Sequence, residues 1–469
     1  MKNVDSARNF VTRFIGFSSG PLIASLIGFL ILPVVTRFLA PDEFGKASIY
    51  TLAVNIIVML VLLGLDQSYV REYHTVSSPT VLFKTVFIIP FAVSVACCLL
   101  CIFFYRPLSL FLFESIEKDI MVLLGLLIPV MVLNKFLSLH IRMQEKSFTY
   151  SAYAVIQKVV YTGFLIVLLL LGDRTFSSIV YATFFSSLSV VVVQLIVYHK
   201  LLLNMQQIDT QLLKQSLSFG IPLVPAALLM WVLNSMDQVA LKIWSDYHAI
   251  GIYAAAFRFV IILTIVKQGF VMFWIPTAYR WHEQKESFQK FDKIAGYLTF
   301  IMTGIFLVMV AGKEMLIQFF DIQYRNAVTI VPFLLLIPVM YTLASASGMG
   351  IGFARKTRFS LLIVAVAAVC NVIGNTALVP AYGALGASLA TGVSFVVYFL
   401  LTTFISRSLW YKFPLGTYFI NISIMCMAAS VQLIIANIWV NSLIICVYLL
   451  VNSKIMKELF SDLYKIRLH

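Results

Sequence analysis

A few ionisable side chains lie within long apolar stretches of this chain, where a charge needs a partner or a polar cavity. They are Asp66, Lys135, Asp237, Arg258 and Lys267. A charged group at the centre of a bilayer costs about 3 kcal/mol even on the most lenient scale. Such residues usually belong to transport pathways or ion relays. They are therefore the first candidates for a functional site.

Arg258 and Lys267 share the eighth apolar stretch. Arg258 lies roughly 13 Å from the outer end of that stretch, too deep for easy snorkelling, so we predict that it faces a cavity and binds substrate. Lys267 is also predicted to bind substrate, and it is turned by about half a turn from Arg258 on an ideal helix, unless the helix bends. Asp237, on the preceding stretch, comes out at a depth similar to that of Arg258. A salt bridge between them would serve ion coupling or gating, or would be a neutralised pair that only fixes packing.

Two further cations, Arg37 and Lys135, are predicted to bind substrate in the same cavity. Arg37 ends the first apolar stretch and corresponds to Asp237 in an internal repeat described below. Lysine and arginine side chains near the end of a span also snorkel to the interface. For both residues that alternative remains open.

Asp66 is followed by Gln67 and then by Arg71 and Glu72 near the inner end of the second apolar stretch. Together, Asp66, Arg71 and Glu72 are predicted to act in ion coupling or in an inner gate. A carboxylate at this place is also expected where it only accepts a hydrogen bond at a helix end. The residues alone do not decide between these functions.

The composition is that of a polytopic helical membrane protein. Hydrophobic residues make up 61% of the 469 and charged residues 12%, whereas an average soluble domain has roughly 25% charged residues. Apolar runs of 18 or more residues recur along the whole chain, as transmembrane helices require. We predict an all-α fold with about fourteen spans, at 14–36, 47–70, 81–104, 120–141, 151–172, 177–199, 217–241, 249–274, 294–312, 328–352, 359–380, 384–405, 417–436 and 438–452.

Lysine and arginine are concentrated in alternate loops and in both terminal segments, which predicts that both termini are cytoplasmic. The net charge of +14 is thus mainly an orientation signal, with a contribution from anionic membrane lipid. Nucleic acid is not an expected partner, because the charges are spread over many short loops. The longest inward connection, 280–293, is predicted to be an amphipathic linker at the interface, with Trp281, Phe288 and Phe291 on one face.

The sequence does not favour an enzyme, a metal site or a bound cofactor. It has no P-loop, and His282-Glu283 lacks the second histidine of a zinc-protease helix. Cys97 and Cys101 share a helical face but have no histidine or carboxylate neighbours, so we interpret them as packing residues. No long outward loop is available to carry the chemistry of a glycan polymerase or ligase.

Two segments about 200 residues apart have the same layout. Residues 18–45 and residues 218–253 each contain a span softened by glycine and proline, a charge near its end, a short loop and a second span. A duplicated membrane half that opens on a broken helix is typical of transporters whose substrate lies between two lobes. We predict an N-terminal lobe at 1–200 (spans 1–6), a C-terminal lobe at 201–406 (spans 7–12), and two additional spans with a cytoplasmic tail at 407–469.

Three segments resemble a known family. They are Leu26-Ile-Gly-Phe-Leu-Ile-Leu-Pro-Val-Val-Thr-Arg-Phe-Leu-Ala-Pro-Asp-Glu-Phe-Gly45, Phe219-Gly-Ile-Pro-Leu-Val-Pro with Trp231, Asp237 and Gly251-Ile-Tyr253, and Asn371-Val-Ile-Gly-Asn-Thr-Ala-Leu-Val-Pro-Ala-Tyr-Gly-Ala-Leu-Gly-Ala387. In this order they look like the Wzx-type O-antigen flippases of polysaccharide biosynthesis, within the multidrug/oligosaccharidyl-lipid/polysaccharide exporter superfamily. The resemblance covers nearly the whole chain. Gln238 departs from it, since the position after the span-seven aspartate is often basic.

The resemblance implies two six-helix lobes, related by pseudo-two-fold symmetry around a cationic cavity, and two added C-terminal helices. It implies transport of an undecaprenyl-diphosphate-linked oligosaccharide, an O-antigen or related repeat unit, from the cytoplasmic to the periplasmic leaflet of the bacterial inner membrane. Alternating access would be coupled to entry of a proton or a sodium ion, with no other cofactor. Other membrane proteins of polysaccharide assembly, including lipopolysaccharide biosynthesis, are candidate partners.

Two alternatives remain. One is an exporter of the same fold with another cargo, such as a cell-wall lipid precursor or an amphiphilic drug cation. A drug-cation exporter is expected to have an acidic cavity, whereas the span charges here lean basic. The other is a membrane glycan polymerase or ligase, which the short outward loops disfavour.

Overall fold

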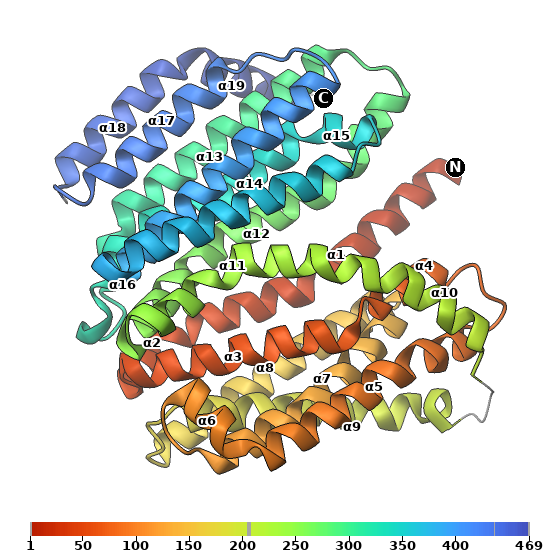
Figure 1. The fold of residues 1–469 in the computed structure, drawn as a ribbon. Helices are drawn as coiled ribbons and strands as arrows, with labels where there is room; N and C mark the ends of the chain where they lie inside the picture. Colours follow the sequence, from red (N-terminus) through yellow and green to blue (C-terminus); the bar gives the residue numbers. More distant parts are fainter. Residues whose placement is uncertain (1, 204–207, 436, 468–469) are drawn as a thin grey trace. The chain divides into compact units, whose positions relative to one another are not determined.

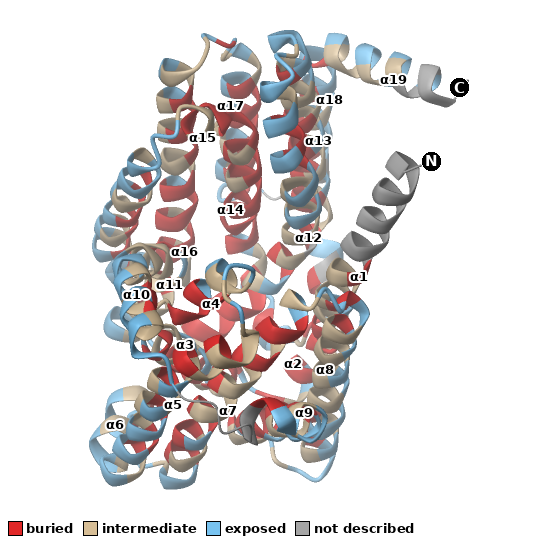
Figure 2. Ribbon diagram, turned by 90° about the vertical axis from the view of Figure 1, so that its right-hand side faces the viewer, coloured by how far each residue is buried: buried red, intermediate tan, exposed pale blue. Residues whose placement is uncertain are grey.

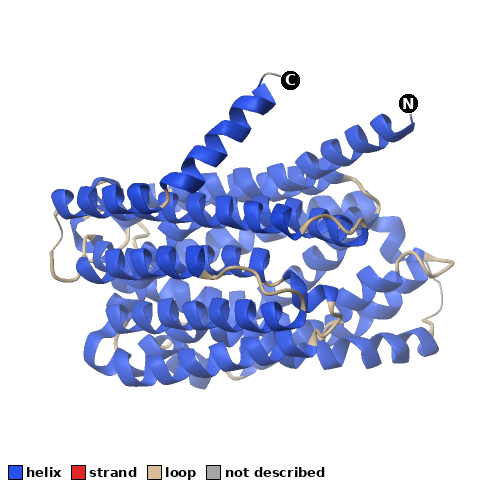
Figure 3. Cartoon of the chain, turned by 90° about the horizontal axis from the view of Figure 1, so that it is seen from above, coloured by secondary structure: helices blue, strands red, loops and turns tan. Residues whose placement is uncertain are grey.

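The structure is a computed structural model and describes residues 2–203, 208–435 and 437–467. Every regular element in these three ranges is a helix, and no strand occurs in them (Figure 3). Helices are the expected solution for such an apolar chain, because a helix satisfies its backbone hydrogen bonds within a single span. The prediction of an all-α membrane fold is confirmed.

The chain divides into two compact units, which we call unit 1 (Met1–Trp231) and unit 2 (Val232–His469). Figure 1 labels the helices along the chain. Unit 1 contains α1 (Lys2–Leu30), α2 (Leu32–Phe38), α3 (Pro41–Leu62), α4 (Leu65–Glu72), α5 (Pro79–Phe103), α6 (Tyr105–Phe113), α7 (Lys118–Met143), α8 (Ser147–Leu170), α9 (Ser177–Leu203), α10 (Thr210–Gly220) and the short 3-10 helix η1 (Ile221–Leu223).

Helix α11 (Val224–Trp244) runs across the division. Unit 2 then contains α12 (Tyr247–Glu283), α13 (Phe288–Ile317), the 3-10 helix η2 (Ile322–Tyr324), α14 (Ala327–Ser347), α15 (Met349–Phe353), α16 (Arg358–Leu409), α17 (Gly416–Val431), α18 (Ile438–Val451) and α19 (Ser453–Arg467). The lobe boundaries at 200/201 and 406/407 stay a prediction, since compact units need not coincide with sequence repeats.

Among the described residues, each of the fourteen predicted spans overlaps a helical segment. Ten helices of the described residues are long and apolar enough to cross a bilayer, or eleven with a bent pair in α12. Helix α16 holds two predicted spans, which separate at Gly383, where φ is +52°. Helices α17 and α18 are apolar but shorter than 18 residues. The predicted number of fourteen spans is therefore approximate, whereas the all-α class of the fold is established.

Helix α14 forms the core of unit 2. It is apolar on all sides, as expected of a helix surrounded by other helices. In its most apolar stretch of 18 residues, 83% of the residues are buried, and Figure 2 draws most of this helix as buried. It packs against α12, α13 and α16. The absence of a polar face in the sequence of α14 thus explains why this helix lies at the centre of unit 2.

Glycines of the first span serve close packing instead of breaking the helix. Helix α1 continues through Gly20 and Pro21, and the break comes at Ile31. A Cβ on Gly20 would lie 2.4 Å from Ser151 Cα of α8, so only glycine allows the two backbones to approach this closely. The first span was predicted to be softened by glycine and proline, and the structure interrupts it at Ile31, two residues before Pro33.

The second predicted span, 47–70, is also interrupted. Leu63 and Gly64 have φ of 51° and 70°, and these left-handed residues end α3 and begin α4. A Cβ on Gly64 would lie 2.3 Å from the carbonyl oxygen of Gly220. The chain can turn here because Gly64 has no side chain. Asp66 therefore lies in the first turn of a new helix and not in the interior of a long one.

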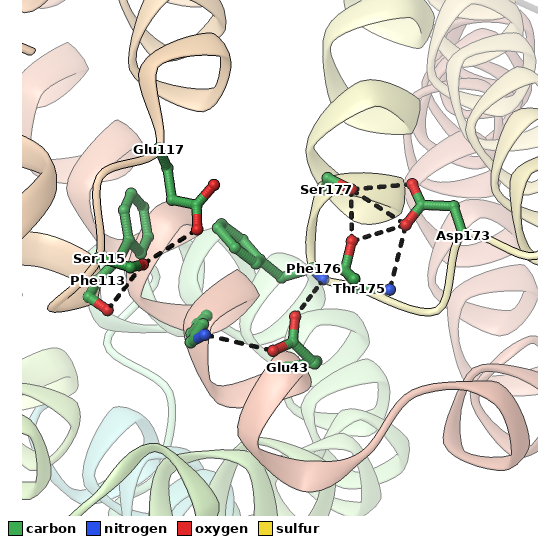
Figure 4. Close-up of polar contacts among 9 residues, drawn as sticks. Glu43, Phe113, Ser115, Glu117, Asp173, Thr175, Phe176 and Ser177 are labelled. Atoms are coloured by element: carbon green, nitrogen blue, oxygen red, sulfur yellow. Dashed lines mark hydrogen bonds and ion pairs between the residues drawn. The ribbon is translucent and has the colours of Figure 1, made fainter.

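The other end of α3 is fixed by polar contacts (Figure 4). Glu43, in the first turn of α3, accepts a hydrogen bond of 2.7 Å from the backbone nitrogen of Phe176 and pairs with Lys46 at 3.3 Å. In the same loop before α9, the Asp173 carboxylate accepts hydrogen bonds from Thr175 and Ser177. These contacts hold α3 against the loop between α8 and α9, so the position of its far end is defined.

The linker at 280–293 differs from its prediction. Phe291 is buried in unit 2, with its ring centroid 5.5 Å from that of Trp281 and 4.8 Å from that of Trp410. Phe288 is half exposed. One predicted interfacial aromatic is thus a core residue. The predicted C-terminal tail, in turn, forms the amphipathic helix α19 and is tied to α13 by a Lys293–Asp462 ion pair of 2.5 Å.

Candidate functional site

A cavity of about 530 Å³ lies within unit 1, among α3, α4, α7, α8, α9 and the start of α11. We call it the unit 1 cavity. Its size falls in the roughly 300–1,000 Å³ range of small-molecule pockets. Its charged lining residues are Asp66 and Lys135. Its amide lining residues are Asn55, Gln67, Asn134 and Gln157, and its hydroxyl lining residues are Ser138, Tyr150 and Tyr153.

Two residues predicted from the sequence, Asp66 and Lys135, meet in this cavity. Lys135 Nζ lies 3.6 Å from Asp66 Oδ2, and Gln67 Nε2 donates to the same oxygen over 2.9 Å. Asp66 is buried, while the Lys135 side chain is 44% exposed. The position of Asp66 in the first turn of α4 also places its charge at the favourable end of the helix dipole. Lys135 therefore has a carboxylate partner and does not simply snorkel.

Helix α4, which carries Asp66, is held by buried polar contacts. Ser68 Oγ donates to the carbonyl oxygen of Ser216 in α10 over 2.7 Å. Tyr69 OH lies 2.8 Å from His140 Nδ1 of α7, and Gln144 Nε2 lies 2.8 Å from the other ring nitrogen of His140. These contacts connect α4 with α7, the helix that carries Lys135. They fix the geometry of the ion pair.

Arg71 and Glu72 pair with each other and not with Asp66. The Arg71 Nε–Glu72 Oε1 distance is 3.3 Å, and the guanidinium lies 4.3 Å from the ring centroid of Phe219. Arg71 and Lys214 line a separate, open cavity of about 660 Å³. Among the described residues, no hydrogen bond or ion pair links Asp66 to Arg71 or Glu72. A gating role for these residues stays a prediction.

Unit 2 contains a buried polar cluster around Asp237, which is 2% exposed. Asp237 Oδ1 accepts hydrogen bonds from Asn371 Nδ2 at 3.3 Å, from Asn375 Nδ2 at 3.1 Å and from the Thr391 hydroxyl. The Tyr253 hydroxyl donates to Oδ2. We call these five residues, drawn from α11, α12 and α16, the Asp237 cluster. Among the described residues, no ion pair neutralises the carboxylate.

The predicted salt bridge between Asp237 and Arg258 is wrong. The Arg258 side chain is exposed, whereas Asp237 is buried among neutral donors. Asp237 and Arg258 were expected at a similar depth on neighbouring helices, but the two side chains do not face each other. Asp237 is hydrogen-bonded to residues of α16, whereas Arg258 is exposed on α12.

The Asp237 cluster fits a small hard cation. Its side chains offer carboxylate, amide and hydroxyl oxygens, which are the ligands preferred by alkali and alkaline-earth ions. Asn375 Oδ1 is buried without a hydrogen-bond partner among the described residues, which such a cation would supply. No group of three or more histidine, cysteine or acidic residues occurs in the described part of the chain. A lone buried carboxylate matches a monovalent ion or a proton.

No function was predicted from the sequence for Asn371, Asn375, Thr391 and Tyr253. A signal was present, because Asn371 and Asn375 are four residues apart in an apolar span and so share one face of the helix. Their amides are both fully buried. Buried polar groups need partners, and a carboxylate in a neighbouring span was the strongest acceptor available.

In the part of the chain that the structure describes, the other predicted cations form no ion pair like that of Lys135 with Asp66. Arg37 of unit 1 and Arg258 of unit 2 are exposed and make no ion pair with a described residue. Lys267 Nζ lies 4.5 Å from the ring centroid of Tyr341, which is stacked on Tyr398 at 5.9 Å. Helix α12 bends by 45° between its parts Tyr247–Ile261 and Leu263–Glu283, so Arg258 and Lys267 do not follow the half-turn expected of a straight helix.

The sequence profile of a family described as "Polysaccharide biosynthesis protein" matches residues 12–282. No curated protein matches the chain. Among solved structures, the chain is similar to "Lipid II flippase MurJ, inward closed conformation", with a TM-score of 0.67 and 13% identity over 96% of this chain and 99% of that one.

It is also similar to a structure described as "MATE multidrug transporter DinF-BH", with a TM-score of 0.61 and 13% identity over 86% of this chain and 95% of that one. A third structure is described as a "multidrug resistance MATE family transporter of the MOP superfamily", with a TM-score of 0.53 and 14% identity over 84% and 95%. At these identities the similarity establishes only that this chain shares the fold of these solved structures.

Proposed function

The chain belongs to the polysaccharide biosynthesis protein family, and from this premise we propose that it moves a lipid-linked oligosaccharide across a bacterial inner membrane. The observation that carries the proposal is the unit 1 cavity, a hollow in which charged, amide and hydroxyl side chains lie beside apolar ones inside an otherwise apolar helical bundle. Charged and amide side chains are costly inside an apolar bundle, whereas a hydrophilic headgroup that crosses a membrane needs them. The cargo is an undecaprenyl-diphosphate-linked repeat unit of an O-antigen or related polysaccharide, which moves from the cytoplasmic to the periplasmic leaflet.

Arg258 and Lys267 of unit 2 and, taken by itself, Arg37 of unit 1 are each cations of a kind that binds the diphosphate of such a lipid. A diphosphate carries concentrated negative charge, and guanidinium groups bind it through charge-assisted, paired hydrogen bonds. Neither arginine is neutralised by a carboxylate of the described residues. In the proposed binding step, the diphosphate therefore binds arginines that have no carboxylate partner among the described residues.

The Asp237 cluster is the proposed coupling site. A buried carboxylate without a cation is unfavourable, so a proton or sodium ion that enters the cluster stabilises the form of unit 2 that closes around it. Coupling follows if this ion binds one transport state more tightly than the other. The neutral donors Asn371, Asn375, Thr391 and Tyr253 hold Asp237 in place while the ion is exchanged.

The orientation proposed for the chain has both termini in the cytoplasm, which the bias of lysine and arginine toward the corresponding loops supports. An exporter of the same fold with another cargo is the second candidate. The similarity in fold to a structure named as a lipid II flippase favours a lipid-linked cell-wall precursor over a drug. Both candidates are transport proteins, and neither requires catalysis.

A deletion strain separates these candidates. Surface polysaccharide is examined on a gel, and the lipid-linked oligosaccharide of each leaflet is assayed in parallel. We expect loss of polymer with complete repeat units trapped in the cytoplasmic leaflet. Normal polymer, or repeat units that reach the periplasm but stay unpolymerised, would contradict the proposed cargo. Arrested cell-wall synthesis with normal polymer assembly would favour the second candidate.

A further inference from the structure

The unit 1 cavity carries no net charge. Among the described residues that line it, only Asp66 and Lys135 are charged, and they pair with each other at 3.6 Å. A diphosphate needs several uncompensated cations to replace its water. The cavity provides none, because an anion that binds Lys135 must compete with Asp66. The diphosphate subsite is therefore elsewhere.

The neutral part of the lining has the chemistry of carbohydrate recognition. Each amide side chain presents both a donor and an acceptor, and each tyrosine hydroxyl does the same, so both can bond to sugar hydroxyls in either role. Asn55 and Tyr153 make no hydrogen bond with another described residue, so their polar atoms are available to a ligand. Gln157 Nε2 donates to Ser187 over 3.1 Å, which leaves its carbonyl oxygen as an acceptor.

The apolar part of the lining complements these groups. Met59, Leu62, Met131 and Leu223 lie around the same cavity as the polar side chains. A sugar ring has C–H faces as well as hydroxyl edges, so it is bound by an apolar wall and a polar rim together. The ion pair of Asp66 with Lys135 places an acceptor and a donor side by side. That arrangement matches two neighbouring hydroxyls or one acetamido group.

We infer that the unit 1 cavity is a glycan subsite that takes uncharged, hydroxyl- or acetamido-bearing sugars, and that it does not bind the diphosphate. This inference rests on the proposed function, since it assigns the sugar part of the same cargo. It also changes the predicted role of Lys135, which becomes half of a sugar-binding ion pair instead of a phosphate-binding cation. The paired charges make acidic sugars poorer ligands than neutral ones.

The test uses the full-length protein in lipid nanodiscs and two lipid probes. One probe is undecaprenyl diphosphate, and the other is the same lipid bearing a single N-acetylhexosamine. The variant Asn55→Leu/Gln157→Met keeps side-chain volume but removes two amides from the cavity. Gln268→Met, an exposed amide of α12 outside the cavity, is the matched control.

We expect the cavity variant to weaken binding of the sugar-bearing probe by about tenfold, since each lost hydrogen bond changes affinity several-fold. Binding of undecaprenyl diphosphate should stay within about twofold of the wild-type value, and the control should change neither. Equal weakening of both probes, or no weakening of either, would overturn the inference. If the wild-type protein binds neither probe, the proposed function itself fails.

A second variant tests the charge argument. Asp66→Asn leaves Lys135 unpaired, so the cavity becomes cationic. A probe whose sugar is a hexuronic acid should bind the wild-type protein more weakly than the N-acetylhexosamine probe, and Asp66→Asn should reverse that order. Tighter binding of the acidic probe by the wild-type protein would contradict a neutral glycan subsite.

Discussion

Asn375 donates a hydrogen bond of 3.1 Å to Asp237 Oδ1, while its own amide oxygen is buried without a partner among the described residues. The two residues are 138 positions apart in the chain and meet in the core of unit 2. A buried amide oxygen without a hydrogen-bond donor is unfavourable, and so is a buried carboxylate without a positive charge beside it. A proton or a small cation that enters the cluster would neutralise the carboxylate.

Asp237→Asn is expected to abolish the stabilisation of the protein by the coupling ion. For a ligand at 100 times its dissociation constant, binding stabilises the folded state by about 2.7 kcal/mol. The thermal unfolding temperature of purified wild-type protein should therefore rise with sodium concentration, or with falling pH if the ion is a proton. The variant removes the charge without changing the shape, so its unfolding temperature should not respond.

Asp119→Asn, at an exposed position in the first turn of α7, is the control and should respond like the wild type. An ion response that persists in Asp237→Asn would exclude the Asp237 cluster as the binding site.

Tyr253→Phe is expected to lower the free energy of unfolding by roughly 1–3 kcal/mol. The change removes one donor from Asp237 and leaves the buried carboxylate less satisfied. Thermal unfolding in detergent measures the effect. Tyr382→Phe removes a hydroxyl from a tyrosine that is 60% exposed, and this control should be neutral. Equal effects of the two changes would mean that the hydrogen bond to Asp237 contributes nothing specific.

Gly64→Ala is expected to prevent stable folding of unit 1 or to reduce it strongly. The left-handed backbone alone costs about 1–2 kcal/mol for a residue with a Cβ, and the new atom would also overlap the carbonyl of Gly220 at 2.3 Å. Gly163→Ala in α8 is the matched control, because a Cβ there meets nothing within 4 Å. Membrane levels of tagged protein should fall for the first variant and stay normal or rise for the second. Normal levels of Gly64→Ala would show that the turn before α4 is not required.

Arg258→Ala is expected to reduce export of the lipid-linked oligosaccharide by at least about tenfold, because a charge-assisted hydrogen bond to a phosphate contributes about 1.5–3 kcal/mol. The protein should remain inserted at normal levels, since Arg258 makes no ion pair with a described residue. Export is measured as surface polysaccharide in a deletion strain that carries the variant. Arg325→Ala, in the loop before α14, should export normally. Wild-type export by Arg258→Ala would remove this residue from the binding step.

The class of the fold was predictable because it depends on the length and apolarity of segments, which are local properties. The places where the chain turns were less predictable. Leu63 and Gly64 interrupt a continuous apolar run, and nothing local distinguishes Gly64 from Gly20, which packs inside a helix. The difference lies in the distant residue that each glycine meets, Gly220 in one case and Ser151 in the other.

The candidate sites show the same limit. The burial of Asp66 and Asp237 follows from their apolar surroundings, but their partners depend on which helix faces lie together. Asp66 forms an ion pair with Lys135, a residue that its charge within an apolar span had already singled out in the sequence. Asp237 is hydrogen-bonded to two asparagines, a threonine and a tyrosine instead of Arg258, and no charge singles these partners out in the sequence. Helix depth can be read from the sequence, whereas helix rotation and the 45° bend of α12 cannot.

Translocation by the purified protein tests the central claim most directly. The protein is reconstituted into liposomes that carry the lipid-linked oligosaccharide in both leaflets, and a glycosidase added outside removes the exposed sugar. We predict that the protected inner pool becomes accessible with time in proteoliposomes, faster when an ion gradient is applied, and stays protected in protein-free liposomes. An inner pool that remains as protected with the protein as without it would contradict the proposed function.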